Sequence, residues 1–203
     1  MDIKKSSGII FHPSALPSRY GIGDFGSEAK EFINFLETTE TKIWQVLPLG
    51  LTSNKEYSPY SSPSSILGNR YLIDLKQLID YDPMLSDKKF DNKSVDYKNV
   101  YEFKDSIFKK ISENIDINDS TYFDFINDDL IRKHITYIVL RDKNKQSSWS
   151  NWEEHEKNYS ESLFDHISKS DLNLTKFHIF TQFEFFKQWK SCLLYTSPSP
   201  RDT

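Results

Sequence analysis

The sequence is poor in the residues that build disulfides and metal sites. Cys192 is its single cysteine, which is consistent with a reducing compartment and predicts no disulfide framework. The five histidines are scattered, at positions 12, 134, 155, 166 and 178. No two of them are four residues apart, the spacing that places two zinc ligands on one helix face. We therefore expect no metal site.

Long apolar runs and excess positive charge are also missing. No apolar stretch approaches the ~20 residues that cross a bilayer, and the N-terminal MDIKKSSG lacks the apolar stretch of a signal peptide. With 26 basic and 30 acidic residues, the net charge of −4 argues against non-specific nucleic-acid binding. These absences predict a cytoplasmic protein with neither a membrane nor a nucleic-acid partner.

A dinucleotide fingerprint is absent despite a superficial match. Gly21, Gly23 and Gly26 fit the string G-x-G-x-x-G, but nine residues with two prolines separate them from the preceding strand signal. A nucleotide-binding turn follows its strand directly, and an acidic residue ends the second strand, where this chain has Pro48 and Leu49. We therefore expect no cofactor.

The N-terminal fifty residues do carry a clear pattern. Gly8 to Phe11 is a short apolar run stopped by His12 and Pro13, as in a buried parallel strand that ends in a loop. Apolar residues then recur at helical spacing between Ala29 and Leu36, and a second strand signal follows at Ile43 to Leu47. The pattern predicts adjacent parallel strands with the helix packed on their outer side.

A loop rich in tyrosine and serine follows, between the strand signals WQVLPL, at Trp44 to Leu49, and YLIDL, which ends at Leu75. Pro59 and Pro63 restrict the backbone, so the loop is expected to be shaped. Its phenol rings, hydroxyls and amide suit a neutral, polyhydroxylated ligand, because sugar rings stack on aromatics and exchange hydrogen bonds with such groups. The alternative is a solvent-exposed Ser/Pro linker.

The remaining chain has mainly helical patterns. Apolar residues recur at helical spacing in Lys98 to Ile115, in Thr121 to Leu140 and in a last long helix that includes Phe177 to Trp189. Trp149 and Trp152 lie between these segments without regular periodicity. They either anchor a loop in the core, which is the favoured interpretation, or stack on a sugar.

Four motifs together carry a family resemblance. HPSALPSRYGIGDFG, KIWQVLPLG, SPYSS and GNRYLIDL, in this order and with these gaps, closely resemble the N-terminal part of amylomaltases, the bacterial 4-alpha-glucanotransferases also called disproportionating enzymes. The resemblance is strong from Ser7 to Leu78, and it returns at Phe177 to Lys190.

The resemblance implies an α/β fold, the N-terminal part of a (β/α)8 TIM barrel with a mainly helical inserted subdomain. The first βαβ unit and the substrate loop would occupy residues 1–80. The helical insertion would follow at 81–170, and the barrel helix before the third strand at 171–191. The implied partners are α-1,4-glucans and maltooligosaccharides.

The resemblance also implies sugar-binding residues. Tyr60 matches a tyrosine that lines the donor and acceptor cleft of the family, and Ser58 matches a serine at the same rim. Tyr101 resembles a tyrosine of a second, remote glucan site, although core packing is the favoured interpretation for this residue. The stretch NKEY departs from the family pattern, so the partner ring of that second site cannot be assigned.

The C-terminal residues 192–203 include CLLYTSPSPRD, which resembles the in-frame translation of a sequencing-library adapter. Native sequence is then expected to end near Ser191. Retaining glycosyl transfer needs two carboxyl groups about 5 Å apart. In amylomaltases they lie on later strands, so no catalytic residue is nominated here. The open alternatives are an amylase-type hydrolase, a non-catalytic glucan-binding module and a helical interaction protein.

Overall fold

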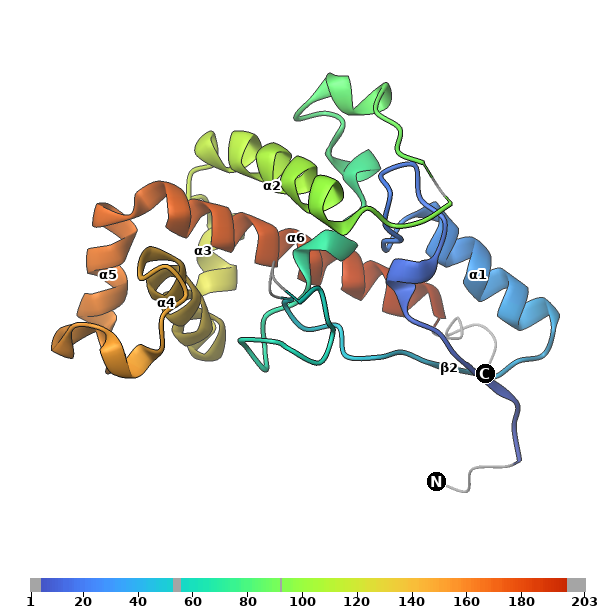
Figure 1. Cartoon of the computed structure of the whole chain (residues 1–203), viewed down its shortest axis with the longest axis horizontal. Coiled ribbons are helices and arrows are strands. Elements are labelled where there is room, and N and C mark those ends of the chain that lie inside the picture. Colours follow the sequence, from blue (N-terminus) through green and yellow to red (C-terminus); the bar gives the residue numbers. More distant parts are fainter. Residues whose placement is uncertain (1–4, 53–55, 92, 197–203) are drawn as a thin grey trace. The chain divides into compact units, whose positions relative to one another are not determined.

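A computed structural model describes residues 5–52, 56–91 and 93–196 (Figure 1). Among these residues, no helix is both long and apolar enough to cross a membrane.

The chain divides into two compact units, each built from segments that are distant in sequence. The first unit contains residues 1–49, 69–104 and 185–203. The second contains residues 50–68 and 105–184. The contacts thus group the tyrosine- and serine-rich loop with the helical middle of the chain. The linear boundaries at 80, 170 and 191 stay a prediction.

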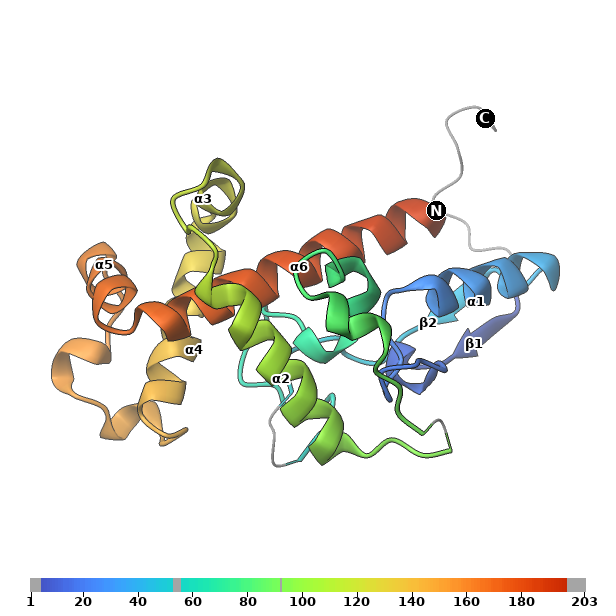
Figure 2. The same cartoon turned by 90° about the horizontal axis from the view of Figure 1, so that it is seen from above.

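The first unit contains the predicted pair of parallel strands. β1 (Gly8–Ile10) pairs with β2 (Ile43–Gln45), and Ile9 lies opposite Trp44. Between them in sequence, α1 (Ser27–Thr38) runs alongside the strands (Figure 2). The Phe32 ring of α1 packs 4.9 Å from the Trp44 ring, edge to face. The predicted strand pairing and its covering helix are therefore confirmed.

The prediction that the first strand is buried is wrong. Ile10 is 66% exposed, and Ile43 on β2 is also exposed. In the described part of the chain, β1 and β2 pair only with each other, so no further strand covers these side chains. Two strands therefore form an apolar sheet whose faces are incompletely packed.

The predicted strand YLIDL is also wrong, because these residues form 3-10 helices, η2 (Arg70–Leu72) and η3 (Leu75–Leu78). Side chains satisfy the backbone groups that a strand would have offered to a neighbour. The Asn69 side chain accepts from the Tyr71 N–H. The Gln188 amide accepts from the Asp74 N–H at 2.7 Å and donates to the Asp74 carbonyl at 3.3 Å. The segment is buried, and side chains supply several of its backbone hydrogen bonds.

Helices dominate the rest of the chain, with α2 at Tyr97–Glu113, α3 at Ser120–Ile126, α4 at Asp129–Lys143, α5 at Glu161–Ser170 and α6 at Leu172–Thr196. The single helix predicted over Thr121 to Leu140 is therefore two helices. Asp128 accepts hydrogen bonds from Leu130 N–H and Ile131 N–H, and this N-cap starts α4 afresh. Residues 197–203 of the predicted adapter tail lie outside the described residues, and its origin stays a prediction.

Candidate functional site

The base of the tyrosine- and serine-rich loop is closed by backbone and side-chain bonds within the second unit. Gly50 and Gly68 form an antiparallel bridge, and Leu51 N–H donates to the Leu67 carbonyl at 2.9 Å. The side chain of Gln182, on α6, accepts from Gly68 N–H at 2.7 Å and donates to the Gly68 carbonyl at 3.0 Å. The loop therefore leaves and re-enters the unit at a fixed point.

Serine hydroxyls shape the inside of the loop. Ser64 Oγ accepts from the backbone N–H groups of Ile66 and Leu67, and it lies 2.8 Å from Nδ1 of His134 on α4. Ser62 Oγ donates to the Ser64 carbonyl at 2.6 Å. Burial lowers the pKa of His134, so the ring is neutral at pH 7 and supports the loop without charge. The linker alternative is disfavoured by this density of internal bonds.

Tyr60 stands at the tip of this framework. Its side chain is 71% exposed, the highest exposure among the large apolar and aromatic residues that the structure describes. The Tyr60 N–H donates to Ser58 Oγ at 3.2 Å, so the two predicted site residues lie together in one turn. An exposed phenol ring on a hydrogen-bonded loop can stack on the C–H face of a sugar and donate or accept a hydrogen bond.

Tyr101, the third predicted site residue, belongs to the first unit and is only 3% exposed. Its ring stacks on that of Tyr71, with centroids 3.3 Å apart. This burial favours core packing over a second glucan site. Of the NKEY stretch, Asn54 and Lys55 lie outside the described residues.

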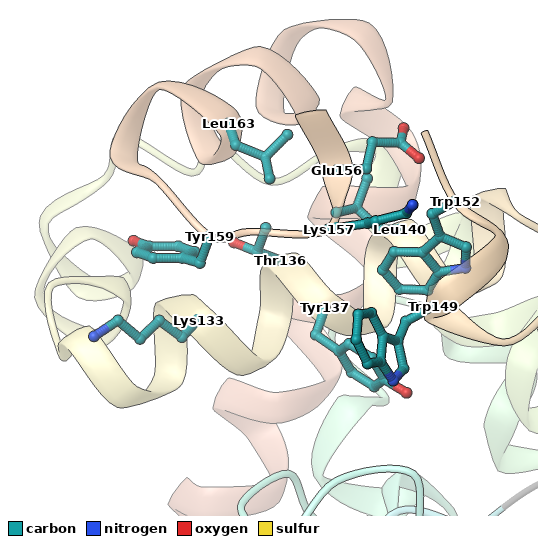
Figure 3. A pocket seen from close by; sticks show the side chains of 10 residues that line it. All are labelled: Lys133, Thr136, Tyr137, Leu140, Trp149, Trp152, Glu156, Lys157, Tyr159 and Leu163. Atoms are coloured by element: carbon teal, nitrogen blue, oxygen red, sulfur yellow. The ribbon is translucent and has the colours of Figure 1, made fainter. Parts of the chain in front are cut away.

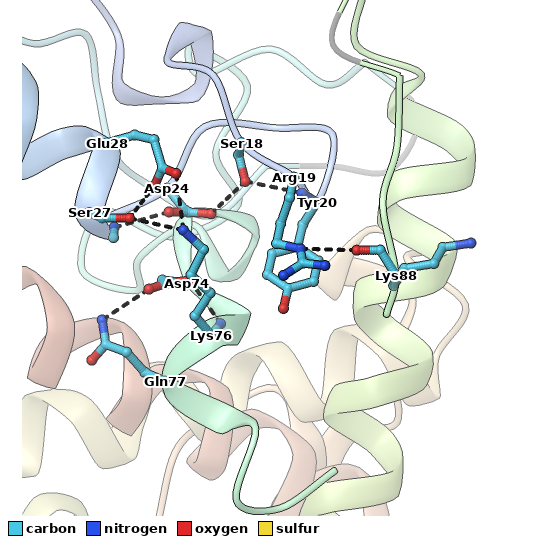
Figure 4. Close-up of polar contacts among 11 residues, drawn as sticks. Ser18, Arg19, Tyr20, Asp24, Ser27, Glu28, Asp74, Lys76, Gln77 and Lys88 are labelled. Atoms are coloured by element: carbon cyan, nitrogen blue, oxygen red, sulfur yellow. Dashed lines mark hydrogen bonds and ion pairs between the residues drawn. The ribbon is translucent and has the colours of Figure 1, made fainter. Parts of the chain in front are cut away.

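Two carboxylates that are distant in sequence, Asp24 and Asp74, come together in the first unit (Figure 4). Asp24 accepts from Ser18 Oγ and Gly26 N–H, and Asp74 accepts from Lys76 N–H. A Cβ added to Gly26 would lie 2.8 Å from an Asp24 oxygen and 2.7 Å from an Asp74 oxygen. Only glycine leaves room for both carboxylates at this point.

A buried ammonium group faces this acidic pair. Lys104, on α2, is fully buried and donates to the Tyr71 and Ile73 carbonyls at 2.7 and 2.8 Å. Burial raises the pKa of Asp24 to about 6, although the Lys104 charge counteracts the shift. Burial likewise lowers the pKa of Lys104 to about 8, against the attraction of both aspartates.

The cluster of Asp24, Asp74 and Lys104 is a structural ion group. Both carboxylates are buried and already hold backbone N–H groups, so no substrate can reach them. They cannot act as the carboxyl pair of a glycosyl transferase, which must flank a scissile bond. The residue missed by sequence analysis was Lys104, and a signal existed: it lies on the apolar stripe of α2 that contains Val100 and Phe108.

Comparison with known proteins identifies the family. The family model described as 4-alpha-glucanotransferase matches residues 11–198. The chain belongs to the 4-alpha-glucanotransferase family. Curated relatives include the 4-alpha-glucanotransferases of Clostridium butyricum, 36% identical over 198 residues, and Aquifex aeolicus, 34% identical over 198 residues. These matches cover 92% and 93% of this chain but 40% of each relative, so the chain spans about two fifths of their length.

Solved structures of the family agree in fold. An amylomaltase from Streptococcus agalactiae, solved in complex with acarbose, superposes with a TM-score of 0.78 at 28% identity, over 95% of this chain and 41% of that one. The amylomaltase of Corynebacterium glutamicum gives a TM-score of 0.66 at 15% identity, which supports the fold alone. The chain thus shares a mixed α/β, mostly helical architecture with part of these proteins.

Proposed function

We propose that this chain is the N-terminal part of a 4-alpha-glucanotransferase that moves an α-1,4-glucan segment to the 4-hydroxyl of another glucan or of glucose. The observation that carries the proposal is the family match over residues 11–198, in register with curated relatives of that activity. Retention of configuration would follow from a covalent glycosyl intermediate on one of two carboxyl groups.

In this proposal the described chain supplies sugar contacts and not the catalytic carboxyl groups. Tyr60 would stack on a glucose unit, with Ser58 at the rim, on the loop that Gln182 and His134 hold. The neighbour bound to acarbose is an amylomaltase, which supports a saccharide ligand for this family. The carboxyl pair would lie in the part of the relatives' length that this chain does not span.

Activity on maltotriose tests the proposal directly. The full-length protein should release glucose and form longer maltooligosaccharides, because each transfer shortens one glucan and extends another. The 203-residue chain by itself should release none, since its buried Asp24 and Asp74 cannot flank a glycosidic bond. Chromatography of the products measures both. Hydrolysis without longer products would instead favour an amylase-type enzyme.

We also infer that β1 and β2 are the first strands of a (β/α)8 barrel, interrupted by a mainly helical insertion. A closed barrel would cover the exposed Ile10 and Ile43, and it leaves no open sheet edge. The described residues contain one pair of strands, whereas such a barrel needs eight.

Expressed alone, the 203-residue chain should aggregate or remain partly molten, because its open sheet edge and apolar strand faces lack their packing partners. Thermal unfolding followed by near-UV circular dichroism and dye binding measures this, with the full-length protein as the control. A sharp, cooperative transition from a monomeric chain would contradict the barrel inference.

A further inference from the structure

The second unit contains an aromatic pocket apart from the tyrosine- and serine-rich loop. It has a volume of about 360 Å3 and is lined by residues of α4, of the segment after α4 and of the start of α5 (Figure 3). Tyr137, Trp149 and Trp152 lie at one end, and Lys133 and Tyr159 lie at the other (Figure 3). Its volume falls within the ~300–1,000 Å3 of small-molecule sites.

The two tryptophans have different environments. Trp152 is buried, its ring packs 5.6 Å from that of Tyr137 and its Nε1 donates to the Ser147 carbonyl at 3.3 Å. It anchors the segment, as the core interpretation predicts. Trp149, in the 3-10 helix η5 (Trp149–Asn151), is 58% exposed although it lines the same pocket. The packed pair of Tyr137 and Trp152 therefore lies beside a largely exposed Trp149 ring at one end of the pocket.

The charged groups at the pocket are already paired within the chain. Lys133 Nζ lies 2.6 Å from the Asp129 carboxylate, and Lys157 Nζ lies 3.0 Å from that of Glu154. Glu156 accepts hydrogen bonds from two side chains at the C-terminal end of α4, Lys143 and Asn144. A charged ligand would have to displace these partners, whereas a neutral ligand would leave them in place.

Polar atoms are present where a neutral ligand could use them. The hydroxyl of Tyr159 donates to Glu161 at 2.9 Å and lies beside the Arg132 guanidinium, and its oxygen has a second lone pair that a ligand can use. Burial, followed by the hydrogen bond and charge of Glu161, raises the Tyr159 pKa to about 12, so the phenol stays protonated. Aromatic faces beside hydroxyl and ammonium groups match the apolar face and polar edge of a sugar ring.

A second pocket, of about 380 Å3, shares Lys133 and Tyr137 with the first and is lined on its other side by Pro63, Ser64 and Ser65. Two residues of α4 thus line both pockets, and the second pocket is also lined by the loop that presents Tyr60.

From this arrangement we infer that the aromatic pocket is an accessory site for an α-1,4-glucan chain, in which Trp149 stacks on a glucose unit. The inference rests on the proposed function for the choice of ligand. The site holds long glucans to the enzyme and takes no part in the transfer step, so it affects polymeric substrates and spares short ones.

Trp149→Ala in the full-length protein tests the site. Migration of the native protein through gels containing amylose should give a dissociation constant roughly 5- to 50-fold weaker than wild type, because one ring face is lost. Disproportionation of maltotriose should stay within about twofold, since this short substrate occupies only the cleft. Trp149→Phe should retain most of the amylose affinity because it keeps an aromatic face.

Phe123→Ala is the matched control, because Phe123 is an aromatic residue of the same unit, 51% exposed on α3 and outside the pocket. It should leave amylose affinity unchanged. Unchanged affinity in Trp149→Ala, an equal loss in Phe123→Ala, or equal retardation by a β-linked glucan would each overturn the assignment. If wild type released no glucose from maltotriose while its amylose affinity still depended on Trp149, the pocket would stand and the transferase proposal would fail.

Discussion

Tyr60→Ala in the full-length enzyme should lower kcat/KM for maltotriose disproportionation roughly ten- to a hundredfold while the fold stays intact. The ring is 71% exposed, so its removal leaves no cavity in the core. Loss of stacking and of one hydroxyl contact with a glucose unit corresponds to about 1–3 kcal/mol of transition-state stabilisation. Glucose release, measured together with the longer products, gives the rate constants.

Two further variants make the result specific to this loop. Tyr60→Phe should do less harm, because it keeps the ring face and loses only the hydroxyl. Tyr81→Ala removes another exposed tyrosine, 55% accessible and outside the loop, and should leave the kinetics unchanged. If Tyr60→Ala had wild-type kinetics, the loop would not belong to the sugar cleft.

Lys104→Met should lower the free energy of unfolding by about 3–5 kcal/mol at pH 7. Among the described residues, it removes the one buried cation that faces Asp24 and Asp74. It also leaves the buried Tyr71 and Ile73 carbonyls without their donor. Lys109→Met, an exposed position on the same helix, should change it little. Urea unfolding of the full-length protein, followed by fluorescence, measures the difference.

The pH dependence of stability distinguishes the charge interaction of Lys104 with Asp24 from its hydrogen bonds to the two carbonyls. The Asp24 pKa rises from 3.8 to about 6 on folding, so the folded state binds the proton more tightly. This contribution to stability is complete below about pH 4 and is lost as pH rises through 6. Asp24→Asn should therefore flatten the decline of the unfolding free energy between pH 4 and 6.

In addition, Lys104→Met should lower the free energy of unfolding by less at pH 5, where Asp24 is protonated, and by less in the Asp24→Asn background. A cost independent of pH would show that Lys104 acts through its hydrogen bonds to the Tyr71 and Ile73 carbonyls and not through its charge.

Local patterns predicted those elements whose hydrogen bonds and packing are local. The paired strands and α1 follow from an apolar run, a helical stripe and turn residues within fifty positions. The segment after the loop has an equally apolar sequence, but the Gln188 amide and the Lys104 ammonium occupy its backbone groups, and it forms 3-10 helices. No pattern within the segment encodes those distant partners.

The composition of the candidate site could be predicted from the sequence, but the residues that hold its loop in place could not. Proline, serine and tyrosine spacing indicated a shaped, neutral loop, and Tyr60 is indeed exposed at its tip. His134 and Gln182, which hold that loop, are single polar residues on helices and resemble ordinary surface positions in sequence. Trp149 and Trp152 were noted in the sequence as a possible aromatic site. Only the fold shows that Tyr137 lines the same pocket.

The two glutamines of α6 have a consequence for how the protein is made. Gln182 holds Gly68 and Gln188 holds Asp74, and each bond spans 114 positions of sequence. A ribosome adds ~5–20 residues per second, so roughly 6–23 s pass between the synthesis of Gly68 and the synthesis of Gln182, its partner on α6. During that interval the nascent loop lacks its final anchor and is open to chaperones and proteases. The loop that presents Tyr60 is therefore among the early segments to leave the ribosome and among the later ones to acquire its shape.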